Sequence, residues 1–311
     1  MNLKLQLPAF GFEFHETTIA HDTEAAVFIP EVWANKILQN IFASSALISS
    51  VSRDYEDEIA QQGDIIHVQK FGTLTAENKV AQTSVTWQNP TATQKDIVLE
   101  FHKIVPFMVE SRALSVGQSG IAEGYIMEAV RAIVNDIESH IAGQWVLAGT
   151  DVTWDPSTEA TKLASLISAR TAITVTGECP SSIPKFMVIK DQGELLNVEK
   201  FTSKDYADGA PLVQGQVGNI LDFNVKESSK IVTLSGQTKR MVLAREAICL
   251  ATRPLAAPAA NSADSAVVNS NGISVRVVRS WDAKEVSDVV TVDVLYGVTV
   301  LRPEWLVSLT D

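Results

Sequence analysis

The chain contains 311 residues, 46% of them hydrophobic, and carries a formal net charge of −12. A chain of this size can bury a substantial core in one elaborate domain or two. No apolar run approaches the roughly 18 residues that a membrane span requires. The basic residues are scattered, which argues against specific binding to a phosphate backbone, although an acidic subunit can enclose DNA without gripping it.

The N-terminal segment and the cysteines bear on the compartment. The first residues combine one lysine with a short apolar alternation and then turn acidic, which does not resemble a signal peptide. Cys179 and Cys249 lie in separate segments without metal-ligand spacing. We therefore expect two free thiols in a reducing cytoplasm.

The first 50 residues divide into an arm and a helix. Residues 1–30 are predicted to be an extended arm, because their apolar residues lack helical spacing and Pro8 and Pro30 bracket the stretch. Residues 31–50 show helical spacing, and Pro30 is compatible with the first turn of that helix.

A long hairpin follows. Two strand-like runs, 65–71 and 97–105, are separated by about 25 mostly polar residues, among which Trp87 is taken as the only large apolar one. Within the first run, Ile66 and Val68 share one face of the strand. A hairpin with so little core of its own must find apolar partners elsewhere.

The next element is a predicted helix of about 30 residues, 118–148, which would run ~45 Å. That is well above the usual three or four turns. Gly143 weakens the last turn, and Gly149 is the expected stop. The apolar stripe has a period of 3.6 residues and consists of Ile126, Val130, Ile133, Ile137 and Ile141.

A further helix is predicted to start with Asp155 as N-cap and Pro156 at its first position, and to end at Gly177. One side of this helix is expected to carry Leu163, Leu166, Ile167, Arg170 and Ile173.

The remaining chain alternates strands and helices without a steady βαβ rhythm, which favours the α+β class. The predicted strands are 186–189, 220–225, 241–243, 272–279 and 289–300. The predicted short helices are 193–198 and 245–250, and the predicted loops are 202–220 and 253–262.

The sequence contains no recognisable catalytic, cofactor-binding or metal-binding constellation. The glycines at 209, 215 and 218 match neither a dinucleotide-binding nor a Walker A loop. The five histidines never fall at metal-ligand spacing. His67 and His102 could face each other across the hairpin and form a weak metal site, but we prefer to interpret them as surface polar residues. The acidic run 54–58 is typical of a solvated segment, and no nucleophile, base and orienter come together.

The order of these elements resembles the HK97-like fold of tailed-phage major capsid proteins, and most closely the branch of P22-type coat proteins. The similarity covers nearly the whole chain, and its motifs are individually short. The stretches that carry it are 29–38, 63–68, 215–225, 245–251 and 296–304.

The resemblance implies a role for each part. It implies an N-terminal arm at 1–30, an N-terminal helix region at 31–59 and an extended loop at 60–105. It implies a peripheral domain at 106–200 with spine helix 118–148, an axial domain at 201–270, and C-terminal strands returning to the peripheral domain at 271–311.

The sequence departs from the family pattern at several points, which limits the family properties that can be expected of this chain. Lys70, Lys79, Lys95 and Lys103 lie in or near the loop, but no local motif marks a cross-link, and none is expected. The stretch 225–245 is too short for the inserted domain of P22-type coats. If Met1 is the natural start, a long N-terminal scaffolding segment has no room, so the resemblance implies a separate scaffolding protein.

The leading function is therefore a structural, non-enzymatic subunit without cofactors that self-assembles into pentamers and hexamers of a phage head around double-stranded DNA. A scaffolding protein and a portal are the implied partners, no membrane is involved, and the virion is the location. The alternative on the same fold is an encapsulin-like compartment shell; an enzyme or a surface adhesin has no support. Candidate inter-subunit contacts are Trp87, Phe71, Lys79, Phe12 and Phe14.

Overall fold

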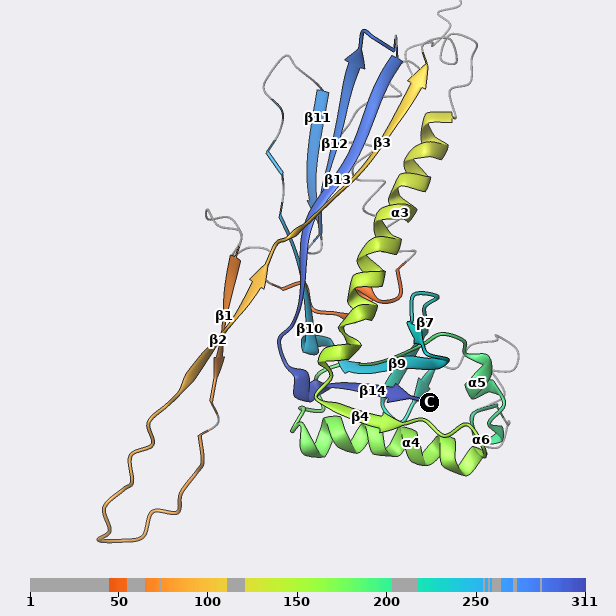
Figure 1. Ribbon diagram of the computed structural model, residues 1–311. Coiled ribbons are helices and arrows are strands. Elements are labelled where there is room, and N and C mark those ends of the chain that lie inside the picture. The colour runs from red at the N-terminus through yellow and green to blue at the C-terminus, as the bar shows by residue number, and fades with distance from the viewer. Residues whose placement is uncertain are drawn as a thin grey trace, which may run out of the picture.

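The computed structural model describes residues 45–54, 65–72, 74–110, 121–202, 218–253, 255–256, 258, 264–270, 273–285 and 287–311. A long sheet with one helix alongside it occupies one end of the molecule (Figure 1). A second sheet with shorter helices occupies the other end, and a hairpin projects to one side. The expected arm 1–30 lies outside the described residues, as do 31–44 of the N-terminal helix region and 55–64.

The first sheet is entirely antiparallel and is organised around its longest strand, β13 (Ser287–Val300). On one side, β13 pairs with β12 (Ile273–Asp282) and then with β10 (Ile248–Arg253). On its other side β13 pairs with β3 (Phe101–Glu110). The strand β11 (Asp264–Ser270) pairs with the outer edge of β12. β13 thus runs from the far end of this sheet to its root, which is the end that adjoins the second sheet.

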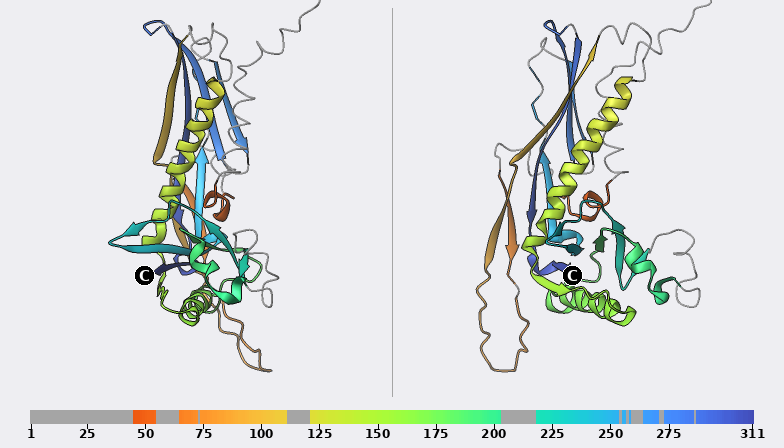
Figure 2. Two further views of the ribbon diagram at one scale, coloured as in Figure 1. Left: turned by 90° about the vertical axis from the view of Figure 1, so that its right-hand side faces the viewer. Right: turned by 45° about the vertical axis from the view of Figure 1, so that its right-hand side comes forward.

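The long helix α3 (Ile121–Gly143) runs along this sheet, as both views in Figure 2 show. Ile133, Ile137 and Ile141 of the predicted stripe are buried, which confirms the 3.6-residue period over the second half of the helix. The helix contacts β13, whose buried Val292 and Val294 belong to the same apolar cluster as these isoleucines. The helix ends at Gly143, and the 3-10 turn η5 (Gln144–Leu147) replaces the last turn that was expected to reach 148.

The second sheet mixes parallel and antiparallel pairs. Its strand order is β4-β14-β9-β5-β7-β6, with β8 paired to β9. The bounds are β4 (Thr150–Thr153), β5 (Lys185–Ile189), β6 (Asn219–Ile220), β7 (Phe223–Glu227), β8 (Thr233–Leu234), β9 (Gln237–Ala244) and β14 (Leu306–Thr310). The helices at this end are α4 (Glu159–Thr171), the π-helical turn η6 (Ala172–Thr176), α5 (Gly193–Leu196) and α6 (Glu199–Thr202).

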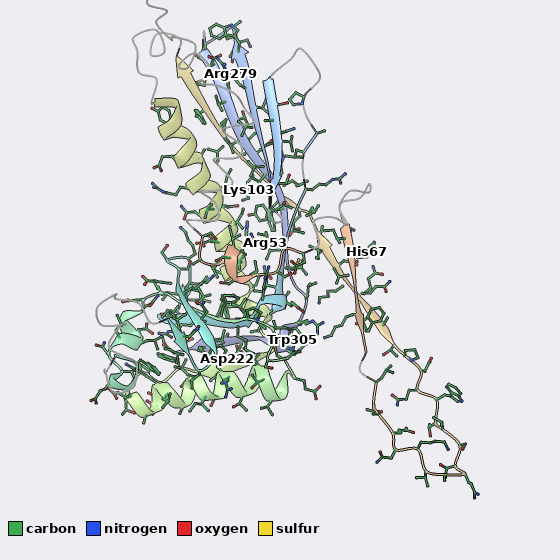
Figure 3. The ribbon with its side chains drawn as sticks, turned by 180° about the vertical axis from the view of Figure 1, so that it is seen from behind. Arg53, His67, Lys103, Asp222, Arg279 and Trp305 are labelled. Atoms are coloured by element: carbon green, nitrogen blue, oxygen red, sulfur yellow. The ribbon has the colours of Figure 1, made fainter. Side chains whose placement is uncertain are left out.

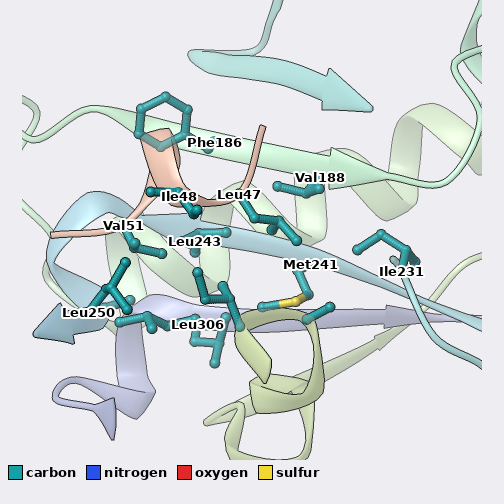
Figure 4. Close-up of a cluster of buried hydrophobic side chains, with 14 of the residues drawn as sticks. Leu47, Ile48, Val51, Phe186, Val188, Ile231, Met241, Leu243, Leu250 and Leu306 are labelled. Carbon is teal, nitrogen blue, oxygen red and sulfur yellow. The ribbon is translucent and has the colours of Figure 1, made fainter. Parts of the chain in front are cut away.

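The main core lies where the second sheet meets the described N-terminal segment and the root of the first sheet. Leu47, Ile48 and Val51, around the 3-10 turn η3 (Ile48–Ser50), insert between strands of both sheets (Figure 4). Met241 and Leu306 line the same cluster. The two ends of the molecule therefore share one continuous core instead of two separate ones.

The sheets cut across the ranges implied by the resemblance. β5, within 106–200, is the parallel neighbour of β7, within 201–270, and β14, within 271–311, joins the same sheet. β10 and β11, also within 201–270, instead belong to the first sheet. Each sheet therefore contains strands from more than one of the implied ranges.

Several local predictions were wrong, each for a physical reason. The run 97–105 is two strands, because β2 (Ala92–Val98) pairs with β1 (Ile65–Phe71) whereas β3 pairs with β13. The stretch 245–250 is the 3-10 turn η7 (Arg245–Ala247) followed by a buried strand; short apolar runs fit either class. The run 220–225 is broken by a turn in which Leu221 and Asp222 have positive φ.

The helix predicted from Asp155 begins later. Thr158 is the N-cap and forms a reciprocal capping box with Thr161, while the Asp155 carboxylate accepts a bond from Ser157 N. The buried side of α4 is Leu166 and its neighbours, Ser165 and Ala169, so Ile167 and Arg170, which were expected on that side, are exposed.

Candidate assembly surfaces

The hairpin β1 (Ile65–Phe71)–β2 leaves the body of the protein, and the loop between its strands extends beyond α4 (Figure 1). The strands pair in regular antiparallel register from Ile65 opposite Val98 to Phe71 opposite Ala92. Every described residue from 74 to 91 is exposed. The residues that the structure describes offer this loop no covering surface.

The candidate contact residues of this loop face solvent. Trp87 is 93% exposed and Phe71 is 75% exposed. Trp87 is not the only large apolar residue of the loop, as the sequence analysis assumed, because Leu74, Val80 and Val85 are also exposed there. Such a concentration of uncovered apolar side chains marks an interaction surface. Phe12 and Phe14 lie outside the described residues.

Side-chain hydrogen bonds shape the loop. Gln88 Oε1 accepts a bond from Thr75 N at 2.8 Å, and Gln88 Nε2 donates to Thr75 O. One side-chain amide thus joins the outgoing and the returning halves of the loop. Lys79 Nζ donates to Val80 O at 3.0 Å and to Thr83 O. Lys79, a predicted inter-subunit contact, thus uses two of its three N–H donors in hydrogen bonds within its own loop.

A buried carboxylate fixes the N-terminal segment to the long helix. Glu138 of α3 accepts bonds from Ser45 Oγ and Leu47 N, each at 3.0 Å, and from Ser228 Oγ at 3.4 Å. Lys226 Nζ donates to Ser49 Oγ at 2.6 Å, and burial lowers the pKa of Lys226. Polar groups in the core therefore hold residues 45–49 in place.

A second polar network joins α3 to the first sheet. Tyr296 Oη of β13 donates to Asp136 Oδ2 at 2.6 Å and also contacts His140 Nδ1. Lys103 Nζ of β3, whose position Figure 3 shows, donates to Asp136 Oδ1 at 3.1 Å. Burial would raise the pKa of Asp136, but the bonds from Tyr296 and Lys103 outweigh it and lower that pKa. Burial and the Asp136 carboxylate both raise the pKa of Tyr296.

These polar groups tie elements together and do not converge on a reactive centre. His67 contacts Asp96 at 2.7 Å across the hairpin, whereas His102 contacts Asp293 in the first sheet, so the two histidines do not face each other. Among the described residues, no group of three or more metal-ligating side chains comes together. Within the same residues, no helix is both long and apolar enough to cross a membrane.

The residues that hold these surfaces in place are not predictable from the local sequence. Glu138 does not belong to the apolar stripe of the predicted helix, and nothing in its local pattern indicates that it is buried. Its partners Ser45 and Ser228 are 93 and 90 positions away in the chain. Long-range hydrogen bonds of this kind leave no local signal in one sequence.

Comparisons with known proteins agree with this architecture. Residues 221–310 match the family described as P22 coat protein, gene protein 5. A search of curated proteins found no significant match.

Solved structures similar to this one include structures from phages and a virus-like particle. A structure described as Mycobacterium phage Che8 has a TM-score of 0.64 at 21% identity, covering 86% of this chain and 91% of that chain. The mature capsid of bacteriophage PhiM1 has a TM-score of 0.57 at 12% identity, covering 86% of each chain. A virus-like particle from Pyrococcus furiosus has a TM-score of 0.51 at 13% identity, covering 89% of this chain and 97% of that chain. The α+β class and the fold expected from the sequence are therefore confirmed: this chain has the HK97-like fold of tailed-phage major capsid proteins, and its residues 221–310 carry the similarity to the P22 coat protein family.

Proposed function

We propose that the protein is a structural major capsid protein, the repeating subunit of an icosahedral phage head, and that it has no enzymatic role. The observation that carries this proposal is the hairpin loop 72–91. Its backbone is organised by its own side chains, yet its apolar residues are not covered by any of the described parts of the chain. A preformed apolar projection is suited to binding a copy of the same subunit, because closed symmetry then covers every projection.

In the assembled shell, pentamers and hexamers of this subunit enclose double-stranded DNA. The scattered basic residues and the net charge of −12 support enclosure without sequence-specific binding. A separate scaffolding protein and a portal complete the assembly in this proposal. The five-stranded sheet with α3 takes the peripheral role, and the second sheet with α4 to α6 takes the axial role around the local symmetry axes.

The test is assembly of the purified protein, alone and with a co-expressed scaffolding protein from the same genome. Sedimentation velocity and negative-stain electron microscopy should show closed shells of uniform diameter. A compact monomer under all solution conditions, also with the scaffold present, would contradict the proposal.

A second candidate function is a compartment shell on the same fold, favoured by the similarity to the virus-like particle from Pyrococcus furiosus. The contents of particles purified from the native source distinguish the two functions. Packaged DNA and a portal support the phage head, whereas an enclosed enzyme supports the compartment.

A further inference from the structure

The root of the hairpin rests on a small core of its own. Ile66, Ile97 and Leu99, at the root of the hairpin, are buried against Cys249 and Ala251 of β10. This hairpin seat, as these five residues are called below, is a separate cluster from the main core. Val68, Leu295 and Leu301 pack around it. An otherwise exposed hairpin is therefore fastened by apolar contacts at one end only.

A glycine permits the hairpin to cross β13 at the edge of the seat. A Cβ added to Gly297 would lie 2.1 Å from Val98 O, 2.9 Å from Val98 C and 3.3 Å from Leu99 Cα. These are backbone atoms, which cannot turn aside as a flexible side chain could. Gly297 is also paired with Ala251 in the first sheet, so it cannot retreat without disturbing β10. The close approach, and not an unusual φ, is what requires glycine here.

An ion pair holds the hairpin farther along. Lys70 Nζ of β1 contacts Glu304 Oε1 in the 3-10 turn η8 (Pro303–Trp305) that follows β13. Lys70 is opposite Thr93, five residues from Val98, or about 17 Å along the strand. Burial would raise the pKa of Glu304, but the hydrogen bond from Lys70 outweighs it and lowers that pKa. The hairpin seat and the Lys70–Glu304 pair hold the hairpin at two different distances from its root, which fixes its direction. A single attachment would leave the hairpin free to pivot.

We propose that the hairpin seat, the crossing at Gly297 and the Lys70–Glu304 pair set the direction of the hairpin inside the subunit, before any neighbour binds. Gly297 is thus a positioning residue for the contact loop. The consequence for shells rests on the proposed function. A subunit with a preset hairpin loses less conformational freedom on binding than one whose hairpin is ordered by its neighbour.

The geometry gives the size of the effect. An alanine at 297 needs about 1.3 Å more room to bring the distance to Val98 O from 2.1 Å to 3.4 Å, where ordinary contact begins. Pivoting at Lys70, about 17 Å away, this tilts the hairpin by roughly 4°. Val85 lies eight residues beyond Thr93, so the loop would move by about 2 Å, enough to separate close-packed apolar atoms.

The chain contains its own probe for this displacement. Cys249 belongs to the seat and is fully buried, and burial, helped by the nearby Asp54 charge, raises its pKa to about 12. Cys179 is buried in the main core, and burial raises its pKa as well. A thiol reagent followed by peptide mass spectrometry therefore reports opening of the seat and of the main core separately in one sample.

The test compares unassembled subunits of the parent, Gly297→Ala and Glu304→Gln, with Gly143→Ala as the matched control. An added Cβ at Gly143 meets nothing within 4 Å. We expect the labelling rate of Cys249 to rise at least tenfold in Gly297→Ala and about threefold in Glu304→Gln, with Cys179 unchanged. Gly143→Ala should label like the parent. Circular dichroism establishes which variants fold.

The proposal is overturned if Cys249 keeps the parental rate in the variants that fold, or if Cys179 accelerates by the same factor. The second result would mean general loss of stability instead of release of the hairpin. Glu304→Gln keeps the test decisive if Gly297→Ala does not fold. Because labelling is measured on subunits, a protein that never forms shells but shows the selective effect would refute the proposed function and leave this inference standing.

Discussion

Replacing Trp87 with serine should weaken the shell and leave the subunit intact. Its side chain is 93% exposed, so the free subunit loses almost no buried area on substitution. Surface changes of this kind typically alter the free energy of unfolding by about 0.5 kcal/mol or less. Any larger effect in the assembled particle must therefore come from a contact between subunits.

The size of that effect follows from the area available. An indole buries roughly 150 to 250 Å², which at about 25 cal/mol per Å² corresponds to about 4 to 6 kcal/mol as an upper limit. Ordering the loop offsets part of this, and tryptophan truncations at interface centres typically cost about 2 kcal/mol or more. A loss of about 2 kcal/mol weakens each contact roughly 30-fold, and every subunit of the shell repeats the contact.

The assay is guanidinium titration of assembled particles followed by light scattering, with subunit unfolding followed by circular dichroism. Trp87→Ser should lower the guanidinium concentration at which particles dissociate while the unfolding midpoint of the subunit stays unchanged. Trp87→Phe, which keeps most of the apolar area, should lie between the two. Equal dissociation midpoints for all three proteins would refute the role of Trp87 as an anchor.

Three further predictions concern the subunit and the arm. Glu138→Ala should lower the free energy of unfolding by about 3 kcal/mol in urea titrations, because buried donors lose their acceptor, whereas the exposed Glu128→Ala should change it little. The Lys70–Glu304 pair should stabilise the subunit above about pH 4.3, the unfolded pKa of a glutamate, and lose this effect as the pH falls through the lower folded pKa; the difference in unfolding midpoint between parent and Glu304→Gln should therefore vanish on acidification. Deleting residues 1–28 should preserve the far-UV circular dichroism spectrum and reduce the yield or stability of particles, and loss of folding would place the arm in the core.

Periodicity predicted the elements whose burial follows from their own pattern. The stripe through Ile133, Ile137 and Ile141 gave the buried face of α3, and the run at 186–189 gave the central strand β5. In both cases every residue of the pattern meets the same environment. The local sequence then contains all the information that the environment uses.

The predictions failed where distant segments decide the outcome. Nothing between Ile97 and Val105 shows that the chain changes partner at Glu100, because the new partner, β13, lies nearly 190 residues further on. The same holds for Gly297, which the sequence places only within the predicted strand 289–300. Only the crossing backbone of Val98 explains why a side chain cannot stand there.

The position of these unpredicted residues has a consequence for assembly. The apolar residues of the loop are exposed within the described part of the subunit, so packing in that part places little constraint on their identity. What the subunit can fix is where the loop points, and it does so through contacts at the hairpin root, where a 1 Å change is multiplied along the strands. Substitutions at the loop should therefore alter the strength of the contact between subunits. Substitutions at Gly297, Lys70 or Glu304 should alter its geometry, giving particles of irregular curvature where loop variants give regular particles that dissociate more easily.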